Sequence, residues 1–231
     1  SPIMQVVTPA DAPSAHALET HIREAGFPCV GAKSALAKGN LSVVHARDIT
    51  SAWNDLEIHR ALVEWSDRYR EERIESGLRS LAVVFDGPED LSEERFEQAL
   101  WDRIQSLSDK DTWRDQPRDP RVSSDPDDPH FSLSFGGEAY FVVGLHPRAS
   151  RLARRFAFPT LVFNLHDQFE ALREQGRYEK MRKTIIDRDI ALAGSPNPML
   201  ARHGEASPAA QYSGRVVDED WVCPFSDTRA A

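Results

Sequence analysis

The sequence predicts an α/β or α+β fold: a small mixed sheet surrounded by helices, with a long C-terminal tail that wraps over the body. Short apolar runs with the length of buried strands recur along the chain. Amphipathic segments of helical period lie between several of them. Because there is no internal repeat and no clean linker, we predict one domain over residues 1–231. Residues 1–15, rich in Pro, Ala and Ser, are expected to be a mobile lead-in.

Four apolar runs are predicted to be strands. The third ends abruptly at His146-Pro147, because proline has no N–H for a sheet ladder and favours an extended residue before it. Ahead of this run, apolar residues alternate with serines over 131–135, and Gly136-Gly137 predicts a hairpin turn. The four runs cover residues 41–46, 81–85, 139–145 and 160–165.

Two long helices are predicted, one at about 51–75 and one that follows the second strand. Asp90 and Glu93 have the spacing of a capping box at the start of the second helix. An apolar stripe predicts its buried face: Phe96, Leu100, Ile104 and Leu107. Shorter helices are expected at 17–25, 149–156, 167–175 and 178–193.

Composition and charge exclude several classes of protein. The net charge of -9 argues against general nucleic-acid binding. No window approaches the roughly 18 apolar residues of a membrane span, so we expect no membrane association. The first residues lack the pattern of a secretory signal, and the two cysteines lie far apart. A cytoplasmic protein with free thiols is therefore expected.

Two predicted strands end in histidine, at His146 and His166. Neutral imidazole is a good ligand for iron, zinc or copper. If the two strands are neighbours, both side chains could reach one pocket. The alternative is that each histidine only makes a hydrogen bond at a strand end.

Arginines follow His146 on a segment predicted to be helical: Arg148, Arg151, Arg154 and Arg155. Arg151 and Arg155 would share a face through their i, i+4 spacing. Guanidinium groups bind carboxylates and phosphates well, so a substrate carboxylate, a phosphate or a cofactor propionate would suit them. The alternative is that these arginines are solvated and pair with the protein's own acids.

Other candidates are two cysteines, two carboxylates and a loop. Cys29 and Cys223 each stand beside proline; thiolate can ligate haem iron, although isolated cysteines are more often buried apolar residues. Asp167 and Glu170 begin a predicted helix, where its dipole stabilises carboxylates, or they could face a pocket and bind a cation. The Asp- and Pro-rich stretch 109–130 reads as a surface loop and a candidate lid.

Five motifs in this order resemble the YqcI/YcgG family: FPCVGAKSAL, YFVVGLHPRASRLARRF, PTLVFNLHDQFEALREQGRYEKMRKTIIDRD, GSPNPML and QYSGR with WVCPF. The resemblance covers about residues 27–225 and is strongest from Tyr140 onward. It implies haem, because members of this family include haem-dependent enzymes that N-hydroxylate guanidines, one of them an arginine hydroxylase. The substrate is implied only loosely, because many members have no known substrate.

Carried onto this chain, the resemblance implies one noncovalent haem b. His146, in the segment Gly-Leu-His-Pro, is the first candidate for the iron ligand, followed by His166, Cys29 and Cys223. Arg148, Arg151 and Arg155 would help to bind the cofactor, the last two through its propionates. Asp167 and Glu170 would hold a cationic substrate.

The implied function is a haem-dependent monooxygenase that N-hydroxylates a guanidine or amine nitrogen of an amino acid such as arginine. Its partners would be a small-molecule substrate, oxygen and an electron donor, and a homodimer is compatible with the sequence. The alternative is a non-catalytic haem-binding or haem-sensing protein. The stretch 109–130 favours the enzyme, because a lid would shield the reaction from water.

Overall fold

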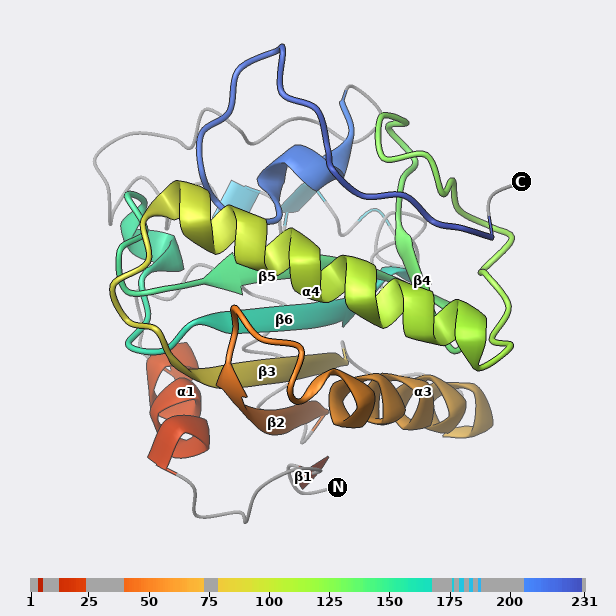
Figure 1. Cartoon of the computed structure of the whole chain (residues 1–231), viewed down its shortest axis with the longest axis horizontal. Coiled ribbons are helices and arrows are strands. Elements are labelled where there is room, and N and C mark those ends of the chain that lie inside the picture. Colours follow the sequence, from red (N-terminus) through yellow and green to blue (C-terminus); the bar gives the residue numbers. More distant parts are fainter. Residues whose placement is uncertain are drawn as a thin grey trace.

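The computed structural model describes residues 4–5, 13–23, 40–72, 79–167, 176, 179–180, 183–184, 187 and 206–229. Its centre is a six-stranded sheet with the strand order β1-β2-β3-β6-β5-β4 (Figure 1). The four predicted strands and the mixed sheet are confirmed. The strands are β1 Met4–Gln5, β2 Leu41–Asp48, β3 Ser80–Gly87, β4 Leu133–Phe135, β5 Glu138–Leu145 and β6 Thr160–Leu165.

The sheet is parallel in one half and antiparallel in the other. β1, β2 and β3 run parallel, whereas the pairs β3–β6, β6–β5 and β5–β4 are antiparallel. Helix α3 (Asp55–Glu72) joins β2 to β3, as a crossover between parallel neighbours requires. The predicted hairpin is also confirmed: Gly136 and Gly137 have φ of 59° and 84°, which glycine adopts without strain.

Helices cover both faces of the sheet. α3 and α4 (Glu93–Trp113) pack on one face, and α1 (Pro13–Arg23) packs on the other (Figure 1). Neighbouring strand residues point to opposite faces, so Val83 joins the core under α3 and α4 while Val84 joins the core beside Leu18 of α1. The stripe predicted for α4 is buried: Phe96, Leu100, Ile104 and Leu107.

The C-terminal tail wraps over the body as predicted. Residues 206–229 contain one short 3₁₀ helix, η2 (Pro208–Gln211), and otherwise run as irregular chain above α4 (Figure 1). Four apolar side chains anchor the tail in the larger core: Ala209, Tyr212, Cys223 and Phe225.

The N-terminus contributes more structure than a mobile lead-in. Met4 and Gln5 pair with Ser42 and Val43 of β2, and α1 already begins at Pro13. Two described parts of residues 1–15 are therefore secondary structure. Most of the helices predicted at 167–175 and 178–193 lies outside the described residues.

Two local predictions are wrong. Asp90 and Glu93 form no capping box, because the hydroxyl of Ser92 caps α4 and accepts a hydrogen bond from the Arg95 N–H at 3.2 Å. The arginine-rich helix at 149–156 is also absent. In its place stands the single 3₁₀ turn η1 (Leu152–Arg154), with extended residues on both sides. The chain turns back here, because the His146 N–H donates to the Arg154 carbonyl at 3.0 Å.

Candidate functional site

His146 and His166 lie at opposite ends of the sheet. β5 and β6 are neighbours, as the shared-pocket hypothesis required, but they are antiparallel: Leu145 pairs with Thr160, and Tyr140 pairs with Leu165. At about 3.3 Å per residue, the two strand ends are roughly 20 Å apart. One pocket cannot take both histidines, and the expectation of a joint site is wrong.

His146 lies in the core. The residue is 1% exposed, and its ring stacks on Phe96 with the centroids 4.1 Å apart. Burial, followed by the charge of Arg154, lowers the pKa of His146 to about 4, so the imidazole is neutral at pH 7. Its Nδ1 has no hydrogen-bond partner among the described residues. The donor chemistry of this ring would therefore suit a metal.

The packing around His146 does not suit a porphyrin. A Cβ added to Gly144 would lie 2.8 Å from Phe96 Cε2 and 3.0 Å from Leu100 Cδ1, so the space beside this strand end is already filled. Because haem needs an open slot next to its axial ligand, we do not place the cofactor at His146.

The arginines after His146 do not form one face. Arg148 and Arg155 are exposed, and Arg155 Nε donates to the Ala149 carbonyl at 2.7 Å. Arg151 is half-buried in extended backbone ahead of the turn. The i, i+4 pairing predicted for Arg151 and Arg155 is wrong, because no helix carries them.

Arg154 has a structural role that the sequence did not reveal. Its guanidinium donates to the carbonyls of Gly144 at 3.1 Å, Tyr212 at 3.2 Å and Gln211 at 2.9 Å. It therefore ties the end of β5 to the C-terminal tail.

His166 lies half-buried at the other end of the sheet. The Ser132 hydroxyl donates to the Tyr140 carbonyl at 3.2 Å, so its oxygen can accept from His166 Nδ1, also at 3.2 Å. Metal-ligating histidines commonly have one ring nitrogen fixed by a hydrogen bond, so the Nδ1 contact of His166 is compatible with a metal ligand.

A charged cluster surrounds Asp167, the next residue. Three carboxylates contact the guanidinium of Arg121. Asp119 accepts from Nε at 3.0 Å and from Nη2 at 2.7 Å, Glu138 accepts from Nη2 at 3.3 Å, and Asp167 lies 2.6 Å from Nη1. We define the charged cluster as Tyr69, Arg70, Asp119, Arg121, Glu138 and Asp167.

Burial differs among the three carboxylates. The side chain of Asp119 is 1% exposed, that of Glu138 is 7% exposed and that of Asp167 is 29% exposed. Burial raises the pKa of Glu138, and the charge of Arg121 offsets this in part. For Asp119 burial is the largest single cause and acts to raise the pKa, but the hydrogen bonds and charge of Arg121, together with the Ala139 N–H, lower the pKa overall. Asp119 and Glu138 therefore differ in acidity, although both contact Arg121.

Tyr69 and Arg70 close the cluster from α3. Burial and then the charge of Asp167 raise the pKa of Tyr69 to about 12, so this phenol stays protonated and donates to Asp167 at 3.4 Å. Arg70 reaches Glu138 at 3.4 Å and the Gly136 carbonyl at 2.5 Å. The cluster thus joins α3, the start of β5, the end of β6 and the loop at 114–132.

The predicted loop at 109–130 is shorter than expected, because α4 continues to Trp113. The remainder is fastened to the sheet by Asp119, whose carboxylate accepts from the Ala139 N–H at 3.1 Å and whose own N–H donates to the Ser134 hydroxyl at 3.0 Å. Arg121 is one of the exposed residues of this loop, with 54% of its side chain exposed. A lid role for this loop stays a prediction.

The remaining candidates divide into two groups. Cys223 is buried, and burial raises the pKa of its thiol to about 12, which disfavours the thiolate that iron would need. Cys29 and Glu170 lie outside the described residues.

In the described part of the chain, no group of three or more His, Cys, Asp or Glu side chains is arranged to hold a metal ion. No helix in the same residues is long and apolar enough to cross a membrane.

Sequence reasoning identified Asp167 but missed the rest of the charged cluster. One signal was present at Glu138, a charged residue between a Gly-Gly turn and a run of buried apolar residues. Another was the Arg118-Asp119-Pro120-Arg121 sequence inside an otherwise acidic stretch. Neither signal shows which other segments of the chain lie beside it.

The comparisons with known proteins agree with the sequence motifs. Residues 18–226 match the YqcI/YcgG family. The chain is 29% identical over 211 residues to the "Uncharacterized protein YcgG" of Bacillus subtilis (strain 168), covering 87% of this chain and 81% of that protein. It is 31% identical over 214 residues to the "Uncharacterized protein YqcI" of the same organism, covering 88% and 82%. No solved structure matches. The chain therefore belongs to the YqcI/YcgG family.

Proposed function

We propose that this protein is a haem-dependent N-oxygenase that acts on a guanidine or amine nitrogen of an amino acid such as arginine. The observation that carries the proposal is the charged cluster beside His166, in which three carboxylates surround a guanidinium group. The family resemblance supplies haem and the reaction type. The charged cluster supplies a reason for a cationic substrate.

The contacts of Arg121 support recognition of a guanidinium. All three of its guanidinium nitrogens meet carboxylate oxygens, with Asp119 contacting two of them and Asp167 the third. Paired contacts of this kind suit the planar fork of a guanidinium group. Because the Arg121 side chain is half exposed, it can turn outward, and a free guanidine can then take its place.

His166 is our choice for the iron ligand. Haem, when bound, would supply the activation of oxygen. The chain's own residues orient the substrate: Asp119 and Asp167 hold the cation, and the protonated phenol of Tyr69 fixes the second oxygen of Asp167. Glu138, the carboxyl whose pKa burial raises, is suited to accept a proton from a bound nitrogen.

The test begins with haem reconstitution. We expect about one haem b per chain. His166→Ala should lose the Soret band or shift the ferrous–CO band, while His146→Ala should keep both. Normal spectra for His166→Ala would reject His166 as the ligand, and no Soret band in the wild-type protein would reject haem. A haem-bound protein that oxidises no guanidine or amine would leave the non-catalytic haem-binding alternative.

The cluster is tested separately through substrate binding. Asp167→Asn should weaken arginine binding about tenfold or more, because a charge-assisted contact contributes roughly 1.5–3 kcal/mol. The matched control is Asp187→Asn, which removes an exposed carboxylate paired with Lys183 and should leave binding unchanged. Equal affinity in wild type and Asp167→Asn would remove the cluster from the proposal.

A further inference from the structure

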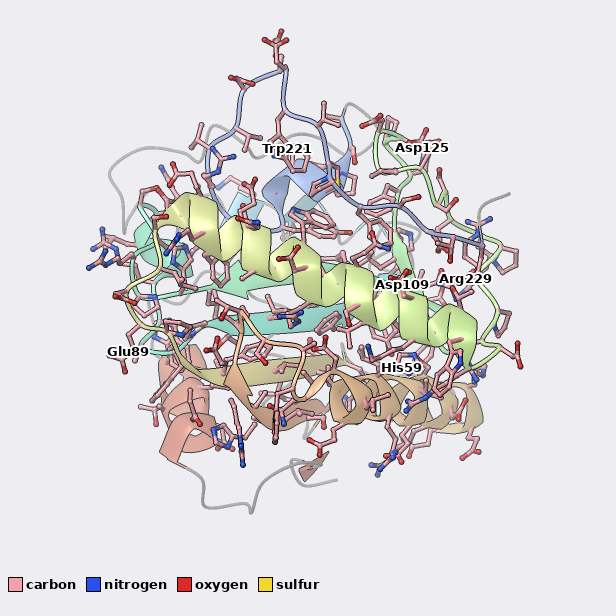
Figure 2. The ribbon with its side chains drawn as sticks, in the orientation of Figure 1. His59, Glu89, Asp109, Asp125, Trp221 and Arg229 are labelled. Carbon is pink, nitrogen blue, oxygen red and sulfur yellow. The ribbon has the colours of Figure 1, made fainter. Side chains whose placement is uncertain are left out.

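The last nine described residues of the tail, 221–229, lie along α4 and are held by side chains (Figure 2). The backbone of Ser226 exchanges two hydrogen bonds with the Gln105 side chain, at 3.0 and 2.9 Å. Thr228 contacts Thr112 through its hydroxyl at 3.3 Å. Within the described part of the chain, no backbone–backbone hydrogen bond joins 222–229 to another element. Residues 221–229, called the strap below, can therefore separate from α4 without breaking the hydrogen bonds of a sheet.

Arg229 makes the deepest polar contacts of the strap. Its guanidinium donates to the Asp111 carboxylate on α4, to the Gln116 carbonyl at 3.1 Å and to the Ser134 carbonyl of β4 at 3.1 Å. Its side chain is only 11% exposed. One residue thus joins the strap to α4, to the loop at 114–132 and to β4.

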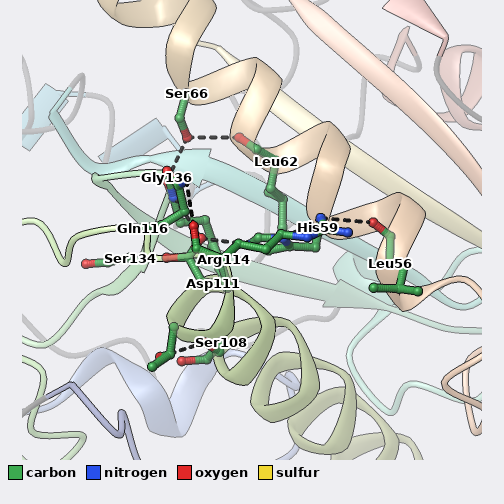
Figure 3. A network of polar contacts seen from close by, with 12 residues as sticks. Leu56, His59, Leu62, Ser66, Ser108, Asp111, Arg114, Gln116, Ser134 and Gly136 are labelled. Carbon is green, nitrogen blue, oxygen red and sulfur yellow. Dashed lines mark hydrogen bonds and ion pairs between the residues drawn. The ribbon is translucent and has the colours of Figure 1, made fainter.

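The buried carboxylate of Asp111 depends on Arg229 for a compensating positive charge. Its side chain is fully buried, and it accepts from His59 Nε2 at 2.7 Å and from the Gly136 N–H at 3.0 Å. The Arg114 guanidinium can only donate, so His59 Nδ1 accepts its hydrogen bond at 2.9 Å while Nε2 faces Asp111 (Figure 3). Among the described contacts of Asp111, Arg229 is therefore the group that brings a positive charge. A buried carboxylate without such a partner is strongly destabilising.

The strap also contributes two buried side chains to the core. Cys223 and Phe225 are buried, and Phe225 lies against Trp101 with the ring centroids 6.2 Å apart. The thiol of Cys223 is unreactive while it is covered, because burial holds its pKa near 12.

We propose that residues 221–229 open and close as a unit, that Arg229 latches them shut, and that opening exposes Cys223 while the sheet stays folded. Release of Arg229 also removes one support from the loop that carries Arg121, through Gln116. The latch thereby couples the tail to the mobility of that loop. The proposal is independent of haem and of the substrate.

Hydrogen–deuterium exchange and thiol labelling test the latch. In a Cys29→Ser background, Arg229→Gln should raise exchange in the peptide 221–229 and labelling of Cys223 at least tenfold, with exchange in β5 unchanged. Lys183→Gln is the control, because it removes a cation from an exposed i, i+4 pair with Asp187. It should behave as the parent protein does.

Two further measurements separate the latch from general destabilisation. Asp111→Asn combined with Arg229→Gln should recover melting temperature relative to Arg229→Gln alone while labelling stays fast, because the buried charge is gone but the strap is still unlatched. In the parent protein itself, 221–229 should exchange at least tenfold faster than β5. Unchanged strap exchange in Arg229→Gln, or equal exchange of strap and β5 in either protein, would overturn the proposal.

Discussion

Acid should destabilise this protein through His146. The folded-state pKa is about 4, against 6.5 for an unperturbed histidine. Above pH 6.5 neither state binds a proton at this ring, so stability is at its full value. Between pH 6.5 and 4 the unfolded chain takes up a proton that the folded protein refuses, and stability falls as the pH falls. The difference of about 2.5 pH units corresponds to about 3 kcal/mol.

The perturbation that isolates this effect is His146→Phe, which keeps a flat ring against Phe96 and removes the titration. Urea unfolding of both proteins should be followed at several pH values between 4.5 and 7.5. Relative to the variant, wild type should lose about 2.5 kcal/mol between pH 7.5 and pH 4.5. Parallel profiles for wild type and His146→Phe would show that His146 is not held neutral by burial.

Two further substitutions test the packing and the capping. Gly144→Ala should destabilise the fold by about 1–3 kcal/mol, because the new methyl group would lie within 3.0 Å of Phe96 and Leu100. The control is Gly87→Ala, whose new methyl group would lie 3.6 Å from its nearest neighbour. Equal melting temperatures for the two variants would contradict the packing argument. Ser92→Ala should cost about 1 kcal/mol through loss of the α4 cap, whereas Ser92→Asp should keep most of the stability; an unchanged urea midpoint in Ser92→Ala would refute the cap.

The strands could be predicted because burial imposes a simple pattern. The runs at 139–145 and 160–165 are apolar along most of their length, and they form β5 and β6. Their direction could not be predicted, because an apolar run reads the same for parallel and antiparallel neighbours. That one undetermined feature decides whether His146 and His166 meet or lie at opposite ends of the sheet.

The prediction of an arginine-rich helix at 149–156 is wrong for a different reason. The spacing of Arg151 and Arg155 is compatible with a helix, but tertiary hydrogen bonds compete with helical ones. Arg154 is fixed by three carbonyls of β5 and the tail, which the local sequence does not contain. Helical propensity is a weak preference, and contacts of this kind override it.

The charged cluster could be predicted only in part, because its members come from four distant segments. Asp167 was visible as a carboxylate after a strand-end histidine. Its partner Arg121 lies 46 positions earlier, in a loop whose composition indicates only solvent exposure. The sheet brings Arg121 and Asp167 together. Asp119 fastens the loop to the start of β5, and the pairing of β5 with β6 places that point beside the end of β6.

Oxygen incorporation tests the proposed N-oxygenase most directly. The haem-reconstituted protein should be incubated with arginine, a reductant or peroxide, and isotopically labelled oxygen gas where the reductant is used. Mass spectrometry should then detect arginine with one added oxygen atom, labelled under the labelled gas, and Asp167→Asn should lose most of this product while keeping its haem. A haem-loaded protein that binds CO but adds no oxygen to arginine or to a panel of guanidines and primary amines would contradict the proposal.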